Sequence, residues 1–335
     1  MVSRGGLAVT REGTAGIMFQ HYRFIDFATQ GYLFGVALLI VLFHGQALPH
    51  WAWLVAGHGL CLGAIHWLIG RHGRGEAGRV LEFLRHFYPV LLYTGFYRET
   101  GVLNRMLCPD YLDPVLIGGE QKLFGLQPSV VFMETFPYLA VSELLYMAYA
   151  SYYFMIAGVG LTLFFRNRAQ FFHYVSVISF VFYVCYTIYI FVPVIGPRVF
   201  FGRAEGYTLP AAVQSLAVST TYPDAVRSGP FYNLMALIYE IFEAPGAAMP
   251  SSHVAIAWCT VYFSFRYLRR IRHLHLTMAV LLCISTVYCR YHYTVDVIAG
   301  ALTAAVLLPL GNWLYWRFEK RPPENGRGLT VTAAA

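Results

Sequence analysis

Long apolar segments alternate with short polar ones along most of the chain. They lie at about 31–48, 51–69, 80–97, 139–165, 171–195, 254–268, 276–291 and 294–316. A helix needs about 20 residues to cross about 30 Å of hydrocarbon, and most of these segments reach or approach that length. Pro89 interrupts the third segment, and Glu82 and Arg85 stand near its start, so its alternative place is the membrane interface. The pattern predicts an all-α protein with eight membrane spans.

The composition of the chain excludes two other classes. Hydrophobic residues make up 58% of the 335 residues and charged residues only 12%. Soluble domains carry about 25% charged residues, so there are too few charges here to cover a water-soluble globule. Intrinsic disorder requires low hydrophobicity and high charge, which is the opposite balance. We therefore expect an integral membrane protein.

Basic residues mark every second loop between the apolar segments. They cluster at 71–79, 166–168, 266–272 and 317–321, whereas the acidic residues gather at 99–134 and 205–243. The positive-inside rule then places both termini in the cytoplasm and residues 98–138 and 196–249 outside it. Because the net charge of +7 belongs to membrane loops, nucleic-acid binding is not expected. Arg outnumbers Lys by 22 to 2, which suggests a GC-rich bacterial genome and hence a bacterial inner (plasma) membrane.

Three polar motifs border the predicted spans on the extracytoplasmic side. They are Gly196-Pro197-Arg198 after the fifth span, Pro250-Ser251-Ser252-His253 at the start of the sixth, and Arg290-Tyr291-His292 with Asp296 after the seventh. The sixth and seventh spans are each about 16 residues, or about 24 Å at 1.5 Å per residue. His253 and His292 therefore return to about the same depth, and we expect the motifs to meet on this face.

Four of these residues are suited to binding a phosphate. Pro250 and the two serines make a good helix start, whose free N–H groups and partial positive charge attract an anion. The guanidinium groups of Arg198 and Arg290 match phosphate oxygens in geometry and charge. We predict that Arg198, Ser251, Ser252 and Arg290 bind phosphate.

His253, His292 and Asp296 are the candidate catalytic residues. On one helix, Asp296 shares a face with His292, four residues earlier. The carboxylate can hold one ring N–H and leave the other nitrogen basic and directed at the substrate. His253 is suited to proton transfer. An Asp in a membrane helix costs about 2.5–3.5 kcal/mol, which favours a functional role. No carboxylate cluster accompanies these residues, so neither a metal nor another cofactor is expected.

The motifs resemble those of the type 2 phosphatidic acid phosphatase (PAP2) superfamily. The likeness rests on Pro-Ser-Ser-His at 250–253 with Arg290, His292 and Asp296, and Gly196-Pro197-Arg198 resembles the first motif of a bacterial branch. Ser252 stands where the superfamily usually has Gly, and Arg290 lies two residues before His292 rather than six. That spacing, with Asp113-Pro114 upstream, is similar to the inositol phosphorylceramide synthase branch, which transfers a phosphorylated headgroup between lipids.

The resemblance implies a six-helix core, with about two additional N-terminal transmembrane helices before it. The amphipathic stretch at 115–124 separately predicts an interfacial helix that lies on the membrane surface. We accordingly expect four parts in the chain. They are an N-terminal cytoplasmic segment (1–30), accessory transmembrane helices with the interfacial helix (31–138), a catalytic core (139–316) and a cytoplasmic tail (317–335).

The resemblance also implies a reaction. His292 would attack phosphorus to form a phosphohistidine, Asp296 would orient it, and His253 would protonate the leaving alcohol. A headgroup such as phosphoinositol would pass from a phospholipid donor to a lipid alcohol such as ceramide or diacylglycerol. Three alternatives stay open: hydrolysis of a lipid phosphate or polyprenyl diphosphate, a transporter or haem protein, and a catalytically silent lipid-binding member.

Overall fold

The regular structure of the protein is helical, as predicted. A computed structural model describes residues 19–45, 48–201, 209, 213 and 222–319. Its helices are α2 (Phe24–Phe43), α3 (Trp51–Gly73), α4 (Arg79–Leu103), α5 (Asp113–Phe124), α6 (Pro128–Thr135), α7 (Leu139–Arg166), α8 (Arg168–Phe191), α9 (Pro197–Phe200), α11 (Asp224–Arg227), α12 (Pro230–Phe242), α13 (Ser252–Tyr267), α14 (Arg272–Tyr288) and α15 (Thr294–Glu319). Most of the predicted segments 1–30 and 317–335 lies outside the described residues.

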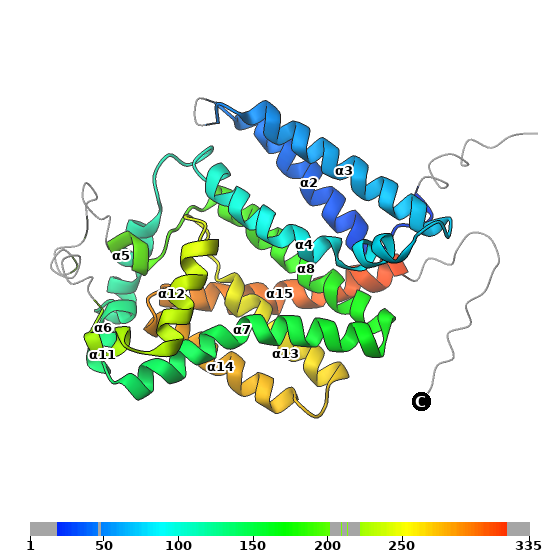
Figure 1. The fold of residues 1–335 in the computed structure, drawn as a ribbon. Helices are drawn as coiled ribbons and strands as arrows, with labels where there is room; N and C mark the ends of the chain where they lie inside the picture. Colours follow the sequence, from blue (N-terminus) through cyan, green and yellow to red (C-terminus); the bar gives the residue numbers. More distant parts are fainter. Residues whose placement is uncertain (1–18, 46–47, 202–208, 210–212, 214–221, 320–335) are drawn as a thin grey trace, which may run out of the picture.

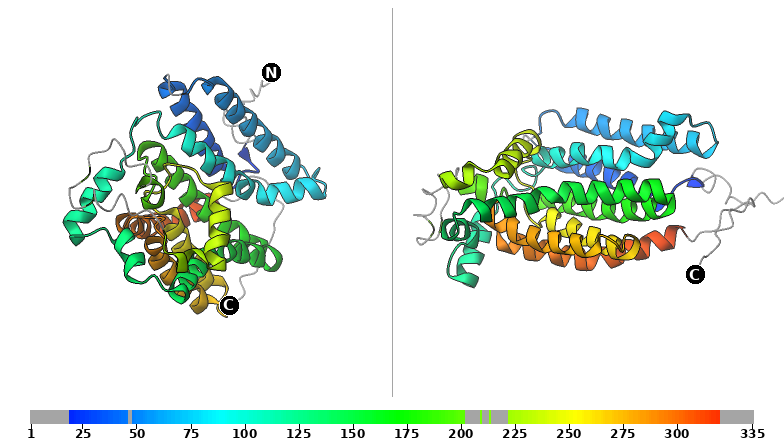
Figure 2. Two further views of the ribbon diagram at one scale, coloured as in Figure 1. Left: turned by 60° about the vertical axis from the view of Figure 1, so that its left-hand side comes forward. Right: turned by 60° about the horizontal axis from the view of Figure 1, so that its bottom comes forward.

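The long helices run side by side, and the short ones gather at one end of the bundle (Figure 1). Figure 2 shows α5, α6, α11 and α12 at this end and the end of α15 at the other. The basic connections α3–α4, α7–α8 and α13–α14 lie away from the short helices, at the end where α15 finishes. The separation of basic and acidic loops read from the sequence is therefore a separation between the two ends of the fold.

Each of the eight predicted spans is a helix in the structure. Among the described residues, α2, α3, α7, α8 and α15 are long and apolar enough to cross a membrane, which supports an integral membrane protein. Helices α13 and α14 have 16 and 17 residues, and α4 carries several charged side chains. That these three helices also cross the membrane stays a prediction.

The first span begins earlier than hydropathy predicts. Helix α2 starts at Phe24 rather than near residue 31, because Asp26 caps its first turn by accepting the Arg23 N–H at 2.7 Å. The carboxylate of Asp26 is buried and also receives two hydrogen bonds from Arg85 of α4, at 2.9 and 2.7 Å. A charged residue lowers the apparent hydropathy of this turn, whereas its ion pair makes burial possible.

The centre of the fold is α8, which packs against α2, α4, α7, α13 and α15. The predicted core, residues 139–316, contains five long helices: α7, α8, α13, α14 and α15. A six-helix core therefore has to take its sixth helix from before residue 139, and α4 is the one that packs along α8. The boundaries at 30, 138 and 316 stay predictions.

Candidate active site

Helix α13 begins at the predicted Pro-Ser-Ser-His motif, at the end of the bundle where the short helices lie. Ser251 caps it, because its hydroxyl accepts the Val254 N–H at 3.4 Å. The Ser251 N–H donates to the backbone oxygen of Asp296 at 3.1 Å, which ties the start of α13 to α15. A Cβ on Gly300 would lie 2.4 Å from the Ser251 backbone oxygen, so this close helix contact requires glycine.

The N–H groups at this helix start are largely occupied. The Ser252 N–H donates to the Tyr189 hydroxyl at 3.2 Å, and this hydroxyl donates to the Pro250 oxygen at 2.9 Å. Among the described residues, the His253 N–H has no acceptor in the protein. We predicted that Ser251 and Ser252 bind phosphate through a free helix start. The Ser252 side chain is also hydrogen-bonded to the Tyr189 hydroxyl, so the structure leaves the His253 N–H as the group available for that contact.

The three candidate catalytic side chains lie together. The imidazole ring centroids of His253 and His292 are 5.7 Å apart. His292 Nδ1 lies 3.5 Å from Asp296 Oδ2, which also accepts the Tyr293 N–H at 2.9 Å. Burial lowers the pKa of His292 to about 4, although a hydrogen bond to the Ala248 backbone offsets part of this. The ring is therefore neutral near pH 7 and retains a basic nitrogen.

Arg198 completes this group of side chains. It lines a small cavity of about 30 Å³ together with His253 and His292. Its guanidinium forms an ion pair with Glu243, just after α12, and lies 4.9 Å from the centroid of the Tyr239 ring. An anion that binds in this cavity would therefore compete with Glu243 for Arg198. Among the described residues, no group of three His, Cys, Asp or Glu side chains could hold a metal ion.

Arg290 points elsewhere, although the sequence placed it beside His292. Its side chain is buried and contacts the Val130 backbone oxygen at 3.4 Å and Glu134 at 3.3 Å, both on α6. Its backbone is left-handed, with φ of 61°, and its carbonyl accepts the Arg198 N–H at 2.7 Å. Arg290 is not among the residues that line the small cavity. Its predicted contact with phosphate stays a prediction.

Two buried carboxylates on α5 accept hydrogen bonds from segments next to the candidate site, and we did not predict them. Asp113 accepts hydrogen bonds from the backbone N–H groups of Ile195 and Gly196 and from the Tyr293 hydroxyl. Glu120 accepts the Thr294 N–H at 2.5 Å and thereby caps α15. Burial raises the pKa of Asp113 to about 6 and that of Glu120 to about 7. The signal in the sequence was two acidic residues seven apart, which share one face of a helix.

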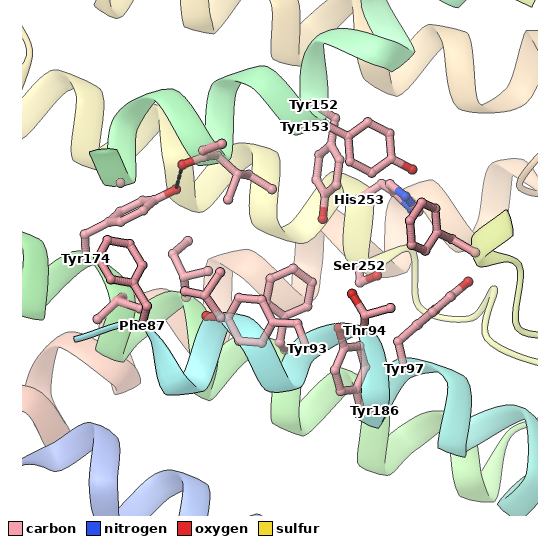
Figure 3. Close-up of a pocket in the computed structure, with 18 of the residues that line it drawn as sticks. Phe87, Tyr93, Thr94, Tyr97, Tyr152, Tyr153, Tyr174, Tyr186, Ser252 and His253 are labelled. Atoms are coloured by element: carbon pink, nitrogen blue, oxygen red, sulfur yellow. Dashed lines mark hydrogen bonds between the residues drawn. The ribbon is translucent and has the colours of Figure 1, made fainter. Parts of the chain in front are cut away.

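A second, larger cavity of about 490 Å³ ends at His253. Helices α4, α7 and α8 supply most of its walls, and the lining is mainly aromatic and aliphatic. Figure 3 shows Ser252 and His253 at one end of the cavity and Phe87 and Tyr174 at the other. Tyr97, Tyr239, Glu243 and His253 line both cavities, so the apolar space adjoins the small polar one.

The fold defines an all-α membrane protein, and its paired imidazoles, buried carboxylate and arginine are suited to phosphoryl transfer. A family model described as the PAP2 superfamily matches residues 120–310, more than half of the chain. The chain belongs to this superfamily, and its function is of the lipid phosphatase or phosphotransferase type. Comparison with curated proteins and with solved structures gave no match. The inositol phosphorylceramide synthase branch stays a prediction, because the family match does not distinguish between branches.

Proposed function

We propose that the protein transfers a phosphorylated headgroup from a phospholipid to a lipid alcohol such as ceramide or diacylglycerol. The observation that carries this is the apolar cavity of about 490 Å³ that ends at Ser252 and His253. Cavities of about 300–1,000 Å³ are typical of ligand sites. A lipid chain in this cavity would bring its polar end to His253, next to the small cavity that Arg198 and His292 line.

The first half-reaction forms a covalent intermediate. Nε2 of His292 attacks phosphorus, the bond from phosphorus to the leaving lipid oxygen breaks, and His253 donates a proton to that oxygen. In the reacting state the His292 ring would leave the Ala248 backbone and donate Nδ1–H to Asp296, whose Oδ2 lies 3.5 Å away, so that the lone pair on Nε2 faces the phosphate. Arg198 and the His253 N–H stabilise the charge on the phosphoryl oxygens.

The second half-reaction reverses these roles. His253 takes the proton from the acceptor hydroxyl, whose oxygen attacks phosphorus, and the bond between His292 and phosphorus breaks. Neither half-reaction requires a metal or another cofactor. The donor and acceptor lipids can use the apolar cavity in turn, because the headgroup stays on His292 between the two steps.

Hydrolysis is the second candidate function. The cavity beside His253 and His292 has a volume of about 30 Å³, and a polar cavity of about 10–15 Å³ already holds one water molecule. Water activated by His253 would release the phosphorylated headgroup, or inorganic phosphate from a lipid phosphate or polyprenyl diphosphate.

One experiment separates these functions. The purified protein is incubated with a panel of phospholipids, lipid phosphates and polyprenyl diphosphates, with and without ceramide or diacylglycerol, and the products are resolved by mass. A new phosphorylated lipid that forms only with an acceptor supports transfer. Release of the headgroup or of phosphate at the same rate without an acceptor supports hydrolysis and contradicts transfer.

The intermediate has its own test. With a substrate that has a good leaving group, the first step needs no acid, so His253→Ala should accumulate acid-labile, base-stable phosphoprotein. His292→Ala should accumulate none. The opposite pattern would exchange the two roles, and no label in wild type during turnover would favour direct transfer between two bound lipids.

We also propose that the site faces the outside of a bacterial inner membrane, as the basic loops indicate. Ser228 is exposed and lies between α11 and α12, at the same end of the fold as the site. In a Cys108→Ser background, Ser228→Cys should react with an impermeant thiol reagent in intact spheroplasts. Labelling only after lysis would place the site in the cytoplasm.

A further inference from the structure

Asp113 has more hydrogen-bond partners than a surface helix residue would need. It is the first residue of α5 and its side chain is 0% exposed. Oδ2 accepts the Ile195 N–H at 3.0 Å, whereas Oδ1 accepts the Gly196 N–H at 2.9 Å and the Tyr293 hydroxyl at 2.9 Å. Among the described residues, no cation forms an ion pair with it. Both oxygens therefore accept hydrogen bonds, and every donor comes from a distant part of the chain.

These donors stand beside two of the candidate site residues. Ile195 and Gly196 immediately precede the Pro197-Arg198 turn, and Tyr293 follows His292. The two segments touch directly as well, since the Arg198 N–H donates to the Arg290 oxygen at 2.7 Å. A Cβ on Gly196, where φ is +85°, would lie 2.6 Å from the Tyr291 oxygen. The contact between the segments is close, and the carboxylate of Asp113 joins them from one side.

We propose that Asp113 is a positioning residue for phosphoryl transfer. Its carboxylate holds the segment that carries Arg198 against the turn that carries His292, and so fixes the distance between the guanidinium and the attacking imidazole. This rests on the proposed phosphoryl-transfer function. Asp113 does not line either of the cavities that reach His253, so it acts through its neighbours.

The neighbouring Glu120 provides a matched control on the same helix. It is equally buried, but both of its backbone hydrogen bonds, to Thr294 and Val295, use Oε1. In Glu120→Gln the amide oxygen can therefore take the place of Oε1 and accept both N–H groups. Asp113→Asn cannot do so, because one of the two oxygens becomes an NH₂ group that faces a backbone N–H. The same chemical change is thus disruptive at one position and tolerated at the other.

The test compares these variants of the full-length protein in two measurements. The first is kcat and KM with the lipid substrate. The second is calorimetric binding of orthovanadate, which adopts the five-coordinate geometry of phosphoryl transfer and needs no known lipid. Asp113→Asn should lower kcat by about 10²-fold, which is the effect of displacing a reacting group by about 1 Å. It should also weaken the binding of orthovanadate by about tenfold or more. The KM of Asp113→Asn should stay near that of wild type. For Glu120→Gln, kcat, KM and the binding of orthovanadate should all stay near wild type.

A purely structural role gives a different result. It would reduce the folded fraction and the melting temperature, but the dissociation constant of orthovanadate would stay unchanged, and that outcome would overturn the proposal. If Asp113→Asn does not fold, Tyr293→Phe removes one of the three donors and should weaken orthovanadate by about 2–10-fold. An unchanged constant in Tyr293→Phe would also overturn it. Wild-type protein that binds orthovanadate but turns over no lipid would instead contradict the proposed function.

Discussion

Replacement of Asp296 by Asn tests the electrostatic part of the site. Asp296 is fully buried, and its Oδ2 accepts the Tyr293 N–H and lies 3.5 Å from His292 Nδ1. An amide oxygen can take the position of Oδ2 and keep both contacts, with the NH₂ group where Oδ1 was. Asp296 Oδ1 has no hydrogen-bond partner among the described residues, so this exchange removes no bond there. Asn therefore preserves the orientation of His292 and removes the negative charge.

The charge is needed when His292 becomes cationic as the phosphohistidine forms. At the observed 3.5 Å between Nδ1 and Oδ2, two unit charges attract by about 5 kcal/mol at an effective dielectric constant of about 20. Each 1.4 kcal/mol is about tenfold in rate, so this corresponds to about 10³-fold. We expect Asp296→Asn to lower kcat by about 10²–10³-fold, since the amide dipole retains part of the attraction.

The assay is single-turnover formation of phosphohistidine, measured beside the melting temperature of each variant. Asp296→Ala is the comparison, because it removes the acceptor as well as the charge and should be slower than Asp296→Asn. A phosphohistidine rate for Asp296→Asn near that of wild type would remove Asp296 from the mechanism. Equal rates in the two variants would mean that only the charge matters and that the orientation of His292 does not depend on Asp296.

Three further predictions follow from contacts around the site. Glu243→Gln frees Arg198 from a partly exposed ion pair worth about 1 kcal/mol or less, so orthovanadate should bind up to about fivefold more tightly, and weaker binding would contradict this. Burial raises the pKa of Glu120 to about 7 from 4.5. The folded protein therefore holds this proton longer than the unfolded chain, and stability falls as the pH rises from about 4.5 to about 7. Glu120→Gln should abolish this loss, about 3 kcal/mol at 1.4 kcal/mol per pH unit, and an unchanged difference in unfolding free energy between pH 5 and pH 8 would refute it. Gly300→Ala should destabilise the protein by about 1–3 kcal/mol in detergent, because its Cβ meets the start of α13. Gly35→Ala, whose Cβ meets nothing within 4 Å, is its control and should melt at or above the wild-type temperature.

The sequence predicted helices well because a membrane leaves a strong hydropathy signal. It also predicted that His253 and His292 meet, since two antiparallel legs of similar length return to the same depth. It placed the start of α2 too late, because the ion pair between Asp26 and Arg85 joins residues that hydropathy treats separately. Pairing between distant segments is the information that a pattern along one chain does not contain.

The direction of Arg290 could not be predicted for a related reason. Two residues before His292, an Arg in a regular helix would lie on a different face from the imidazole. The chain leaves α14 at Tyr288, and Arg290 takes a left-handed conformation that turns its side chain toward Glu134 on α6. Of the two arginines that the sequence proposed, Arg198 reaches the small cavity with the histidines. The positive φ of Arg290 could not be predicted from the sequence, because Arg is not among the residues that favour the left-handed conformation.

Helices that precede residue 139 contribute to the candidate site. Helix α4 supplies one wall of the apolar cavity, and Asp113 of α5 supplies the acceptors for the N–H groups of Ile195 and Gly196. A buried N–H without a partner costs about 1–3 kcal/mol, and these two N–H groups immediately precede the Pro197-Arg198 turn. A fragment that begins at residue 139 would retain His253, His292 and Asp296 and lose these acceptors. The apolar cavity and the segment that carries Arg198 therefore depend on residues 79–124.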